Sequence, residues 1–248
     1  MHSSHRHVLG VEREPVGRHG LTVDLEAIRH NTGVLLGRGP VLADVTADGY
    51  GHGAAEVADV AVAAGATCLG LSRPWDAEAV RSIGVDLYVV PGFSGVVQTG
   101  EFTVAGPALY GLTDDPGLRP AMRVSAVVVA TKTIDAGEGV SYGLTYRATA
   151  RTNLALVGIG YADGLDRAAG NVASLLLNGV QRRIVGRVAM NALVLELNDG
   201  TAEVGDEAVV FGDPAAGEPH VRDWAAAIDR PPAEITSVFG RHMPRSYA

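Results

Sequence analysis

Cysteine and lysine are almost absent from this sequence, with one residue of each. Because Cys68 is alone, the chain cannot form an internal disulfide, which fits the reducing cytoplasm, and its apolar neighbours predict a buried structural thiol. Lys132 stands in a valine-rich stretch that predicts a strand, with its side chain in solvent. A reaction that needs a lysine amine therefore has a single candidate residue in this chain.

Long apolar runs and an excess of positive charge are also missing. No apolar run reaches the roughly 18 residues of a membrane-spanning helix, and a polar, histidine-rich stretch follows Met1 instead of the apolar core of a signal peptide. The formal net charge of −8 argues against a nucleic-acid partner. We therefore expect a cytoplasmic protein with neither a membrane nor a nucleic-acid partner.

The 248 residues, 47% of them hydrophobic, are enough for one or two domains with a core. Residues 1–17 show no periodicity and predict a disordered tail. His5 and His7 could share a metal ion there, but a solvated tail explains them equally well, and we expect no metal site.

The most informative stretch is Val45–Gly53, which reads VTADGYGHG. It follows an apolar run at 40–45 and precedes an Ala/Val-rich segment at 54–66, so it predicts a strand, a glycine-rich loop and a helix. Its three glycines permit positive φ or close approach to a ligand, and the N–H groups at the helix start can bind an anion. A tight turn without any ligand would explain the same spacing.

Strands and helices alternate in the first part of the chain. Strands are predicted at 21–23, 40–45, 67–71 and 86–90, and helices at 25–36, 54–66 and 74–83. This order implies parallel strands with right-handed crossovers. From Ala121 onward, short strands with turn signals, among them Asn178-Gly179, predict an antiparallel, barrel-like β domain with one short helix at Val221–Ile228.

Several blocks resemble the alanine racemase family, whose members are pyridoxal phosphate (PLP) enzymes. VTADGYGHG resembles the end of the family signature A-V-V-K-A-D-A-Y-G-H-G, GPALYGL resembles its R-P-G-x-A-L-Y-G-L, and GEGVSYG, GIGYADGL, VGRVAMN and RHMPRSY also look like family blocks. The resemblance implies a (β/α) barrel followed by a C-terminal antiparallel β-barrel domain. A complete (β/α)8 barrel takes about 250 residues. We therefore predict a truncated TIM-barrel-like part at 18–112, with a deletion near 92–102, and the β domain at 113–248.

The resemblance places Thr46 where the family has the lysine that forms a Schiff base with PLP. A hydroxyl cannot form an imine. The family's histidine network, its arginine at the pyridine nitrogen and its serine and glycine phosphate ligands are expected in the deleted segment. From these differences we predict a protein without a cofactor, PLP included.

The resemblance also implies a set of catalytic residues. The tyrosine of GYADG is the family's second acid–base group, so Tyr161 holds that place and is expected to act across a dimer interface. Asp163 is expected to support the Tyr161 turn, and His52 to take part in catalysis. Each has a structural alternative: Tyr161 as a packing residue, Asp163 in a turn with Gly164, and His52 as a support of the glycine loop.

The predicted substrate-binding residues are Tyr50, Thr46, Met190, Asn191, Arg241, Arg245 and Tyr247. Tyr50 and Tyr247 match family tyrosines that contact the cofactor phosphate. Met190 matches a methionine whose backbone touches the substrate. The two arginines are candidate cations beside Tyr161.

Together these features predict a homodimer with a shared site for a small-molecule substrate. The predicted activity is a PLP-independent isomerisation, epimerisation or cyclisation by proton transfer, in specialised metabolite biosynthesis. Two alternatives stay open: a non-catalytic scaffold or binding protein, and a genuine PLP-dependent amino-acid racemase.

Overall fold

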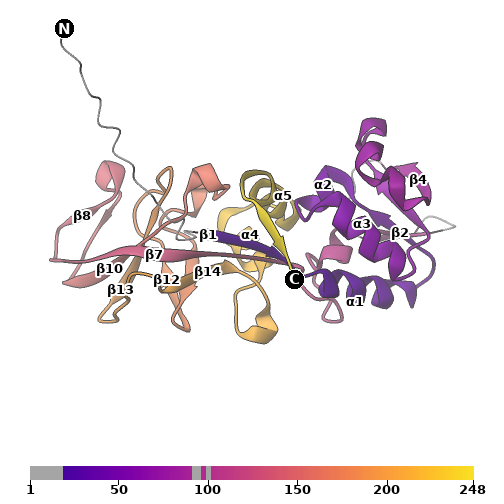
Figure 1. Ribbon diagram of the computed structural model, residues 1–248. Helices are drawn as coiled ribbons and strands as arrows, with labels where there is room; N and C mark the ends of the chain where they lie inside the picture. The colour runs from indigo at the N-terminus through magenta and orange to yellow at the C-terminus, as the bar shows by residue number, and fades with distance from the viewer. Residues whose placement is uncertain (1–18, 91–95, 99–101) are drawn as a thin grey trace, which may run out of the picture.

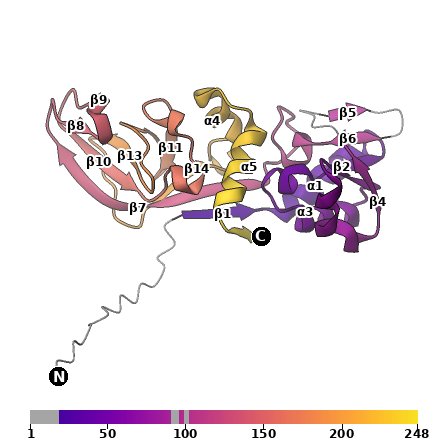
Figure 2. The same cartoon turned by 90° about the horizontal axis from the view of Figure 1, so that it is seen from above.

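The computed structural model describes residues 19–90, 96–98 and 102–248. An α/β part and a β part lie end to end, with helices α4 (Val221–Ile228) and α5 (Pro232–His242) between them (Figures 1 and 2). The predicted tail at 1–17, with His5 and His7, and most of the predicted deletion region lie outside the described residues. No described helix has the length and apolar character to cross a membrane.

The β part is organised by one long strand, β7. Its main strands are β1 (His19–Val23), β7 (Met122–Ile134), β10 (Thr152–Val157), β11 (Ser174–Leu177), β12 (Val180–Arg183), β13 (Leu193–Asn198), β14 (Glu207–Phe211) and β15 (Arg245–Tyr247). β7 pairs antiparallel with β1, β10 and β14, β10 continues to β13, and β14 continues through β11 to β12. A bridge between Ile184 and Leu195 ties the end of β12 to β13, so six of these strands form a ring. The predicted antiparallel barrel-like domain is confirmed.

Two local features of this part follow from the sequence. Asn178 and Gly179 both have positive φ, 52° and 74°, which is the conformation of a tight turn between antiparallel strands, and the predicted hairpin between β11 and β12 is confirmed. A short ribbon, β8 (Gly139–Val140) with β9 (Tyr146–Arg147), extends from the end of β7.

The first and last described strands of the chain meet in the β part. β15 pairs parallel with β1, so the predicted strand at 21–23 joins the sheet of the β part and not the sheet of the α/β part. This pairing brings the C-terminal residues close to the glycine-rich stretch Val45–Gly53.

The α/β part has an open sheet in the order β4–β3–β2–β6–β5. Its elements are α1 (Leu25–Leu36), β2 (Val41–Asp44), α3 (Ala54–Ala63), β3 (Cys68–Leu71), η1 (Pro74–Ile83), β4 (Asp86–Val89), β5 (Val96–Gln98), β6 (Thr103–Ala105) and η2 (Pro107–Tyr110). The neighbouring strands β4, β3, β2 and β6 are parallel to one another, and the edge strand β5 is antiparallel to β6. Within the described residues β4 pairs with β3 alone and its side chains are exposed, as expected for a barrel that is truncated. The predicted fold class is therefore confirmed.

Two helices differ from the predictions, since α5 lies where the sequence predicted no helix. Residues 74–83 form 3₁₀ turns, not an α-helix. Arg73 donates to Asp76 from both Nε and Nη2, at 3.1 Å each, and this contact across three residues fits the tighter 3₁₀ turn.

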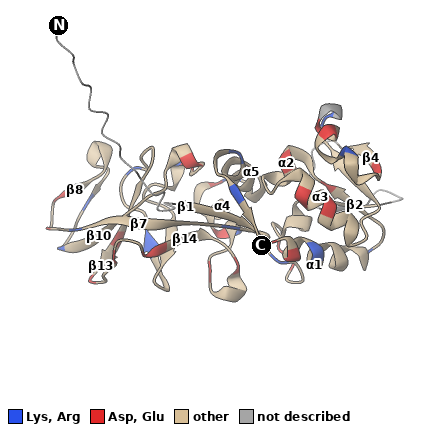
Figure 3. Ribbon diagram, in the orientation of Figure 1, with Lys and Arg blue, Asp and Glu red and all other residues tan. Residues whose placement is uncertain are grey.

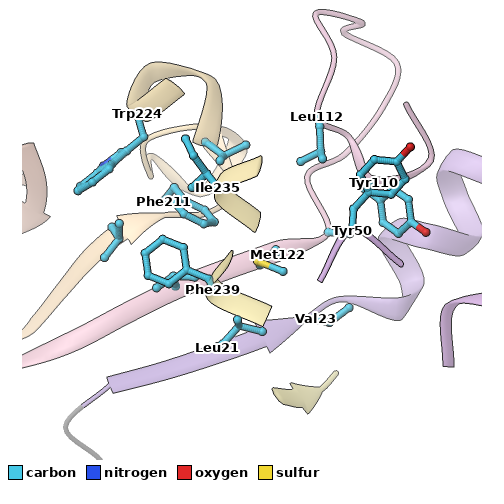
Figure 4. Close-up of a cluster of buried hydrophobic side chains, with 14 of the residues drawn as sticks. Leu21, Val23, Tyr50, Tyr110, Leu112, Met122, Phe211, Trp224, Ile235 and Phe239 are labelled. Carbon is cyan, nitrogen blue, oxygen red and sulfur yellow. The ribbon is translucent and has the colours of Figure 1, made fainter. Parts of the chain in front are cut away.

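The two parts share one apolar core, which passes beneath α5. Asp24 is the N-cap of α1, and its side chain accepts a hydrogen bond from the Ala27 N–H at 3.0 Å. In the junction Phe239 of α5 packs edge-on against Phe211 of β14, with ring centroids 5.6 Å apart, close to Leu21 and Met122 (Figure 4). This packing fixes α5, and therefore the residues that α5 presents to the site.

A charged network on the face of β7 makes stability depend on pH. Arg123 donates to both carboxylate oxygens of Glu207 at 2.8 Å and to Glu218 at 2.8 Å. The hydrogen bonds from Arg123 lower the pKa of Glu207 from 4.5 to about 2. A carboxyl with a depressed folded-state pKa stabilises the fold above its unfolded value, and this contribution is lost as the pH falls through 4.5 toward 2.

Replacing Glu207 by Gln is therefore expected to flatten the fall in stability between pH 4.5 and pH 2. Because the Glu207 side chain is half exposed, the difference should be about 1 kcal/mol or less. Urea unfolding across this pH range measures it, with Glu203→Gln as control, since Glu203 forms no ion pair with a described residue. Equal pH dependence of wild type and Glu207→Gln would contradict the prediction.

Candidate functional site

The chain between β2 and α3 forms a left-handed turn, where the sequence predicted a glycine-rich loop. Within the short element α2 (Thr46–Tyr50), Ala47, Asp48, Gly49 and Tyr50 have φ of 52°, 59°, 62° and 53°. For residues other than glycine this conformation costs about 1–2 kcal/mol each. Such strain persists only where the surroundings hold it, and it clusters at functional sites.

Asp48 and Arg245 hold this turn from outside. Asp48 Oδ1 accepts a hydrogen bond from the Ala54 N–H at 2.9 Å, and its Oδ2 accepts one from Arg245 Nη1 at 2.5 Å. The same nitrogen donates to the carbonyls of Gly51 and Gly240, at 3.2 and 3.3 Å. The acidic segment of α2 and the basic segment of β15 are visible in Figure 3. Arg245, predicted as a substrate ligand, therefore joins the C-terminus to the glycine turn in this chain.

Thr46 and Tyr50 face a carboxyl group that the motif reading did not single out. Asp44, at the end of β2, is fully buried; its Oδ1 accepts from the Thr46 N–H at 3.0 Å and its Oδ2 from the Tyr50 hydroxyl at 2.8 Å. Burial raises the pKa of the Asp44 carboxyl and also that of Tyr50. Thr46 and Tyr50 are themselves 6% and 7% exposed, so the Tyr50 hydroxyl is turned into the protein.

His52 is fully buried beside these residues. Its Nδ1 lies 2.9 Å from the Gly49 carbonyl and 3.2 Å from the Tyr50 carbonyl, so Nδ1 donates and holds the left-handed turn. Its Nε2 has no hydrogen-bond partner among the described residues. Burial lowers the pKa of His52 to about 4, which leaves the ring neutral near pH 7. The ring lies 4.5 Å from that of Tyr110, whose hydroxyl donates to the Asp44 carbonyl at 2.9 Å.

A cleft of about 300 Å³ opens at the carboxyl ends of β2 and β3. Val45, Ala47 and Asp48 line one wall, η1 contributes Asp76, and α5 contributes Ser237 and Arg241. Ligands of open α/β sheets bind at this end of the strands. Arg241 makes no hydrogen bond or ion pair with any described residue, so a cation is available to an anionic ligand.

Tyr247 lies at the start of α3. A Cβ added to Gly53 would come within 2.2 Å of the Tyr247 hydroxyl oxygen, so the glycine permits this approach. Burial raises the pKa of Tyr247.

Tyr161 belongs to a second hollow, of about 460 Å³, in the β part. It starts the 3₁₀ turn η4 (Tyr161–Asp163), in which Asp163 Oδ2 accepts from the Gly160 N–H at 2.8 Å. A Cβ on Gly160 would be 2.3 Å from the Met190 carbonyl oxygen, so the glycine allows the turn to pack against the backbone of Ala189 and Met190. Asp163 thus supports the turn, and Tyr161 is 40% exposed.

Met190 and Asn191 line the same hollow as Tyr161, together with Arg167 and Arg187. The Arg167 guanidinium lies over the Tyr161 ring, 5.6 Å from its centroid. Within one chain the cation beside Tyr161 is therefore Arg167, whereas Arg241 and Arg245 are on the other hollow or at the glycine turn.

No described residue lines both hollows. The structure thus brings Thr46, Tyr50, His52, Arg245 and Tyr247 together around the glycine turn. It brings Tyr161, Asp163, Met190 and Asn191 together in the β part. Sequence reasoning missed Asp44, Tyr110 and Arg167, and the one signal for Asp44 was a carboxylate at the end of an apolar strand.

Comparison with known proteins places both parts in one family. The family model for the alanine racemase N-terminal domain matches residues 23–96, and the model for the alanine racemase C-terminal domain matches residues 121–247. The alanine racemase of Thermobifida fusca (strain YX) is 46% identical over 147 residues, 57% of this chain and 39% of that protein. That of Mycobacterium leprae (strain TN) is 43% identical over 149 residues, 57% of this chain and 38% of that protein. The matched region spans about two fifths of the length of these relatives.

Solved structures agree in fold. The alanine racemase from D-cycloserine-producing Streptomyces lavendulae superposes with a TM-score of 0.84 at 26% identity, over 93% of this chain and 97% of that chain. The alanine racemase from Bartonella henselae with covalently bound pyridoxal phosphate gives a TM-score of 0.80 at 17% identity, over 94% of this chain and 100% of that chain.

The prediction that the protein uses no cofactor is wrong on these findings. The relatives are named alanine racemases, and the Bartonella henselae structure contains covalently bound pyridoxal phosphate. The prediction failed because it inferred from Thr46, and from family residues expected in the deleted segment, that no cofactor site remained. Thr46 removes an amine, but it leaves the cleft and its cation in place.

Proposed function

Since this chain belongs to the alanine racemase family, we propose that it is an isomerase that moves a proton at the α-carbon of a small amino acid, with pyridoxal phosphate as cofactor. The observation that carries this proposal is the presence of two complementary half-sites: the strained turn with its cationic cleft, and the exposed Tyr161 turn. Inversion at carbon needs proton-transferring groups on opposite faces of a bound substrate.

The two half-sites lead us to propose a homodimer. The cleft and the Tyr161 hollow share no described residue, so one chain does not enclose a substrate between them. A two-fold dimer would place the Tyr161 turn of one copy over the cleft of the other, twice. The exposed side chains around Tyr161, including Tyr142 at 77% and Met190 at 54%, are consistent with a surface that such a partner covers.

The residues around the cleft fit pyridoxal phosphate in part. A phosphate fits the guanidinium of Arg241, which lines the cleft. A covalent bond does not fit, because Thr46 has no amine and Lys132 lies on β7 in a separate hollow of the β part with Thr131 and Asn153. We therefore propose that the cofactor is held by non-covalent contacts. When bound, it supplies the electron withdrawal that acidifies the α-carbon of an amino acid.

The remaining chemistry is assigned to side chains of this protein. The Tyr161 hydroxyl exchanges a proton with the substrate on one face, with Arg167 over its ring and Asp163 holding its turn. The Met190 backbone and Asn191 line the same hollow and orient the substrate. His52 acts as a neutral support of the left-handed turn.

Two further predictions from the sequence become part of this proposal. We propose a cytoplasmic location, supported by the buried free thiol of Cys68. We also propose the domain division between residues 112 and 113, where the chain leaves η2 for β7, with β1 crossing into the sheet of the β part. A role in specialised metabolite biosynthesis stays a prediction.

Purified protein supplied with pyridoxal phosphate is expected to convert L-alanine into D-alanine and to exchange the α-hydrogen in D₂O. Chiral chromatography and mass spectrometry measure these, over a panel of small amino acids. Dialysis should remove the cofactor completely, because no covalent bond holds it. Arg241→Ala should weaken cofactor binding by about tenfold or more, since it removes the charged partner. Arg81→Ala, an exposed arginine of η1 outside the cleft, is the matched control. No exchange with any amino acid of the panel would contradict the proposal.

A further inference from the structure

A further pocket, of about 250 Å³, is lined by α4, α5 and the chain that begins at Tyr161. We call it the α4–α5 pocket. None of its lining residues belongs to the cleft, whereas Tyr161 and Arg167 line both this pocket and the hollow of the β part. The pocket is therefore a separate space that borders the hollow at these two residues.

The floor of the α4–α5 pocket is apolar because two helices bring apolar faces to it. Trp224 and Ile228 are four residues apart in α4, and Ile235 and Phe239 are four residues apart in α5, so each pair shares one helix face. All four side chains are buried, and Trp224, Ile235 and Phe239 belong to one cluster (Figure 4). A floor of this kind takes an apolar group.

The polar atom of the Trp224 side chain is engaged outside the pocket. Its indole Nε1 donates to the carbonyl of Ser174 at 3.1 Å, and Ser174 does not line the pocket. Leu165, which also lines the pocket, is buried. The side chains of the floor thus offer a ligand no free hydrogen-bond donor or acceptor.

Two carboxylates at the rim of the pocket share one cation. Asp166 Oδ2 and Glu234 Oε1 lie 3.4 and 3.5 Å from the same atom, Arg230 Nε. Asp166 Oδ1 accepts a hydrogen bond from the Ala168 N–H at 2.8 Å. One guanidinium therefore faces two carboxylates, and one negative charge is left over. Because these side chains are partly exposed, their ion pairs are weak and can rearrange around a ligand.

The cation that completes the rim is Arg167, in the 3₁₀ turn η5 (Arg167–Ala169). Its guanidinium lies over the Tyr161 ring, and it has no carboxylate partner among the described residues. Arg167 directly follows Asp166 in the chain. An α-amino acid carries its ammonium and carboxylate groups on one carbon atom, so neighbouring side chains of opposite charge can bind both.

We propose that the α4–α5 pocket binds an α-amino acid with a branched or aromatic apolar side chain. The carboxylate of the ligand pairs with Arg167, its ammonium group pairs with Asp166 and Glu234, and its side chain lies on the apolar floor. The volume of about 250 Å³ is below the range of about 300–1,000 Å³ for drug-sized ligands, which fits a molecule of this size. The site is separate from the cleft, and this inference does not depend on the proposed function.

Trp224 makes the site observable, because the sequence contains only two tryptophans. In a Trp75→Phe protein Trp224 is the remaining tryptophan, and titration with L-leucine is expected to change its fluorescence emission saturably. The titration is carried out without added PLP, so that no turnover contributes. L-alanine, which lacks most of the apolar side chain, should bind about 10–10²-fold more weakly, because each buried methylene group adds to the affinity.

Ligand analogues and variants in the same Trp75→Phe protein test each charged contact. 4-Methylpentanoate lacks the ammonium group of leucine, and 3-methylbutan-1-amine lacks the carboxylate, so each should bind about tenfold or more weakly than leucine. Arg167→Gln should weaken leucine binding by about tenfold and leave the binding of the amine unchanged. Glu234→Gln should weaken leucine binding and leave the binding of 4-methylpentanoate unchanged. Arg187→Gln is the matched control, because Arg187 lines the hollow but not the pocket.

The absence of a saturable response to leucine would overturn the proposal, as would analogues that bind as tightly as leucine. If Arg187→Gln weakens binding as much as Arg167→Gln, the ligand lies in the hollow and the pocket assignment is wrong. If a second copy of the chain covers the pocket, leucine will fail to bind at concentrations at which sedimentation shows a dimer, and this result also overturns the proposal. The fluorescence readout needs no catalysis, so failure of the proposed racemisation would leave it intact.

Discussion

Alanine at position 240 is expected to lower the free energy of unfolding by about 3 kcal/mol, the upper end of the usual range for an overpacked core. Gly240 lies in α5 where this helix crosses the glycine turn. A Cβ at this position would be 2.0 Å from the carbonyl oxygen of Gly51 and 2.4 Å from its Cα. Both are backbone atoms, so the clash can be relieved only by moving α5 or the left-handed turn.

Gly33 provides a matched control, because it also lies within a helix, α1, and a Cβ there meets nothing within 4 Å. Gly33→Ala should stabilise the protein by about 0.5–1 kcal/mol, since glycine is a poor helix former. Urea unfolding of both variants measures the contrast. Equal stabilities for the two alanine variants would show that the α5 backbone at Gly240 does not pack as closely against Gly51 as described.

Tyr161→Phe is expected to reduce turnover on the true substrate by about 10²–10⁴-fold, the usual contribution of a general acid–base group. The variant loses one hydroxyl from a ring that is 40% exposed, so the fold and the proposed dimer should be unchanged. Tyr88→Phe is the control: it makes the same chemical change at a side chain of equal exposure on β4, away from both hollows. Turnover of Tyr161→Phe within a few-fold of wild type would make Tyr161 a packing residue.

If the site is shared between two copies, as proposed, a sharper form of this test is possible. Mixing Tyr161→Phe with Arg241→Ala after reversible dissociation should restore about one quarter of wild-type turnover, because half of the dimers are mixed and each has one intact site of two. Tyr161→Phe alone should stay nearly inactive, and Arg241→Ala alone should be nearly inactive when the cofactor concentration is far below its weakened Kd. No recovery in mixtures that sedimentation shows to be dimeric would contradict a site built from two copies.

Much of the architecture follows from local sequence signals. Period-two apolar patterns and turn pairs such as Asn178-Gly179 predict antiparallel strands because the backbone conformation of these residues is set locally. The strand, glycine stretch and helix around residues 40–66 were predicted for the same reason. The family blocks then identified the fold class, and the family models match both parts of the chain.

These local signals do not predict contacts between residues that lie far apart in the sequence. Arg245 holds Asp48 across nearly two hundred positions, and α5 reaches the turn through the pair Gly51 and Gly240. These contacts hold four consecutive residues in a left-handed conformation that three of them would not adopt by local preference. The cofactor prediction failed at a related point, since it inferred the loss of a whole binding site from Thr46 and from a segment expected to be deleted, without the packing of the residues that remain.

The sequence by itself determined the family, the order of the secondary structure and the residue types at each half of the site, because these depend on local patterns of apolar, glycine and polar residues. Only the tertiary structure decided that Tyr161 lies outside the cleft of its own chain and that Asp44 stands behind Thr46. The physical reason is that burial and hydrogen-bond partners come from the packing of distant segments. Asp44 is an ordinary carboxylate in the sequence, and its pKa is raised because the packing of β2, η2 and the left-handed turn buries it.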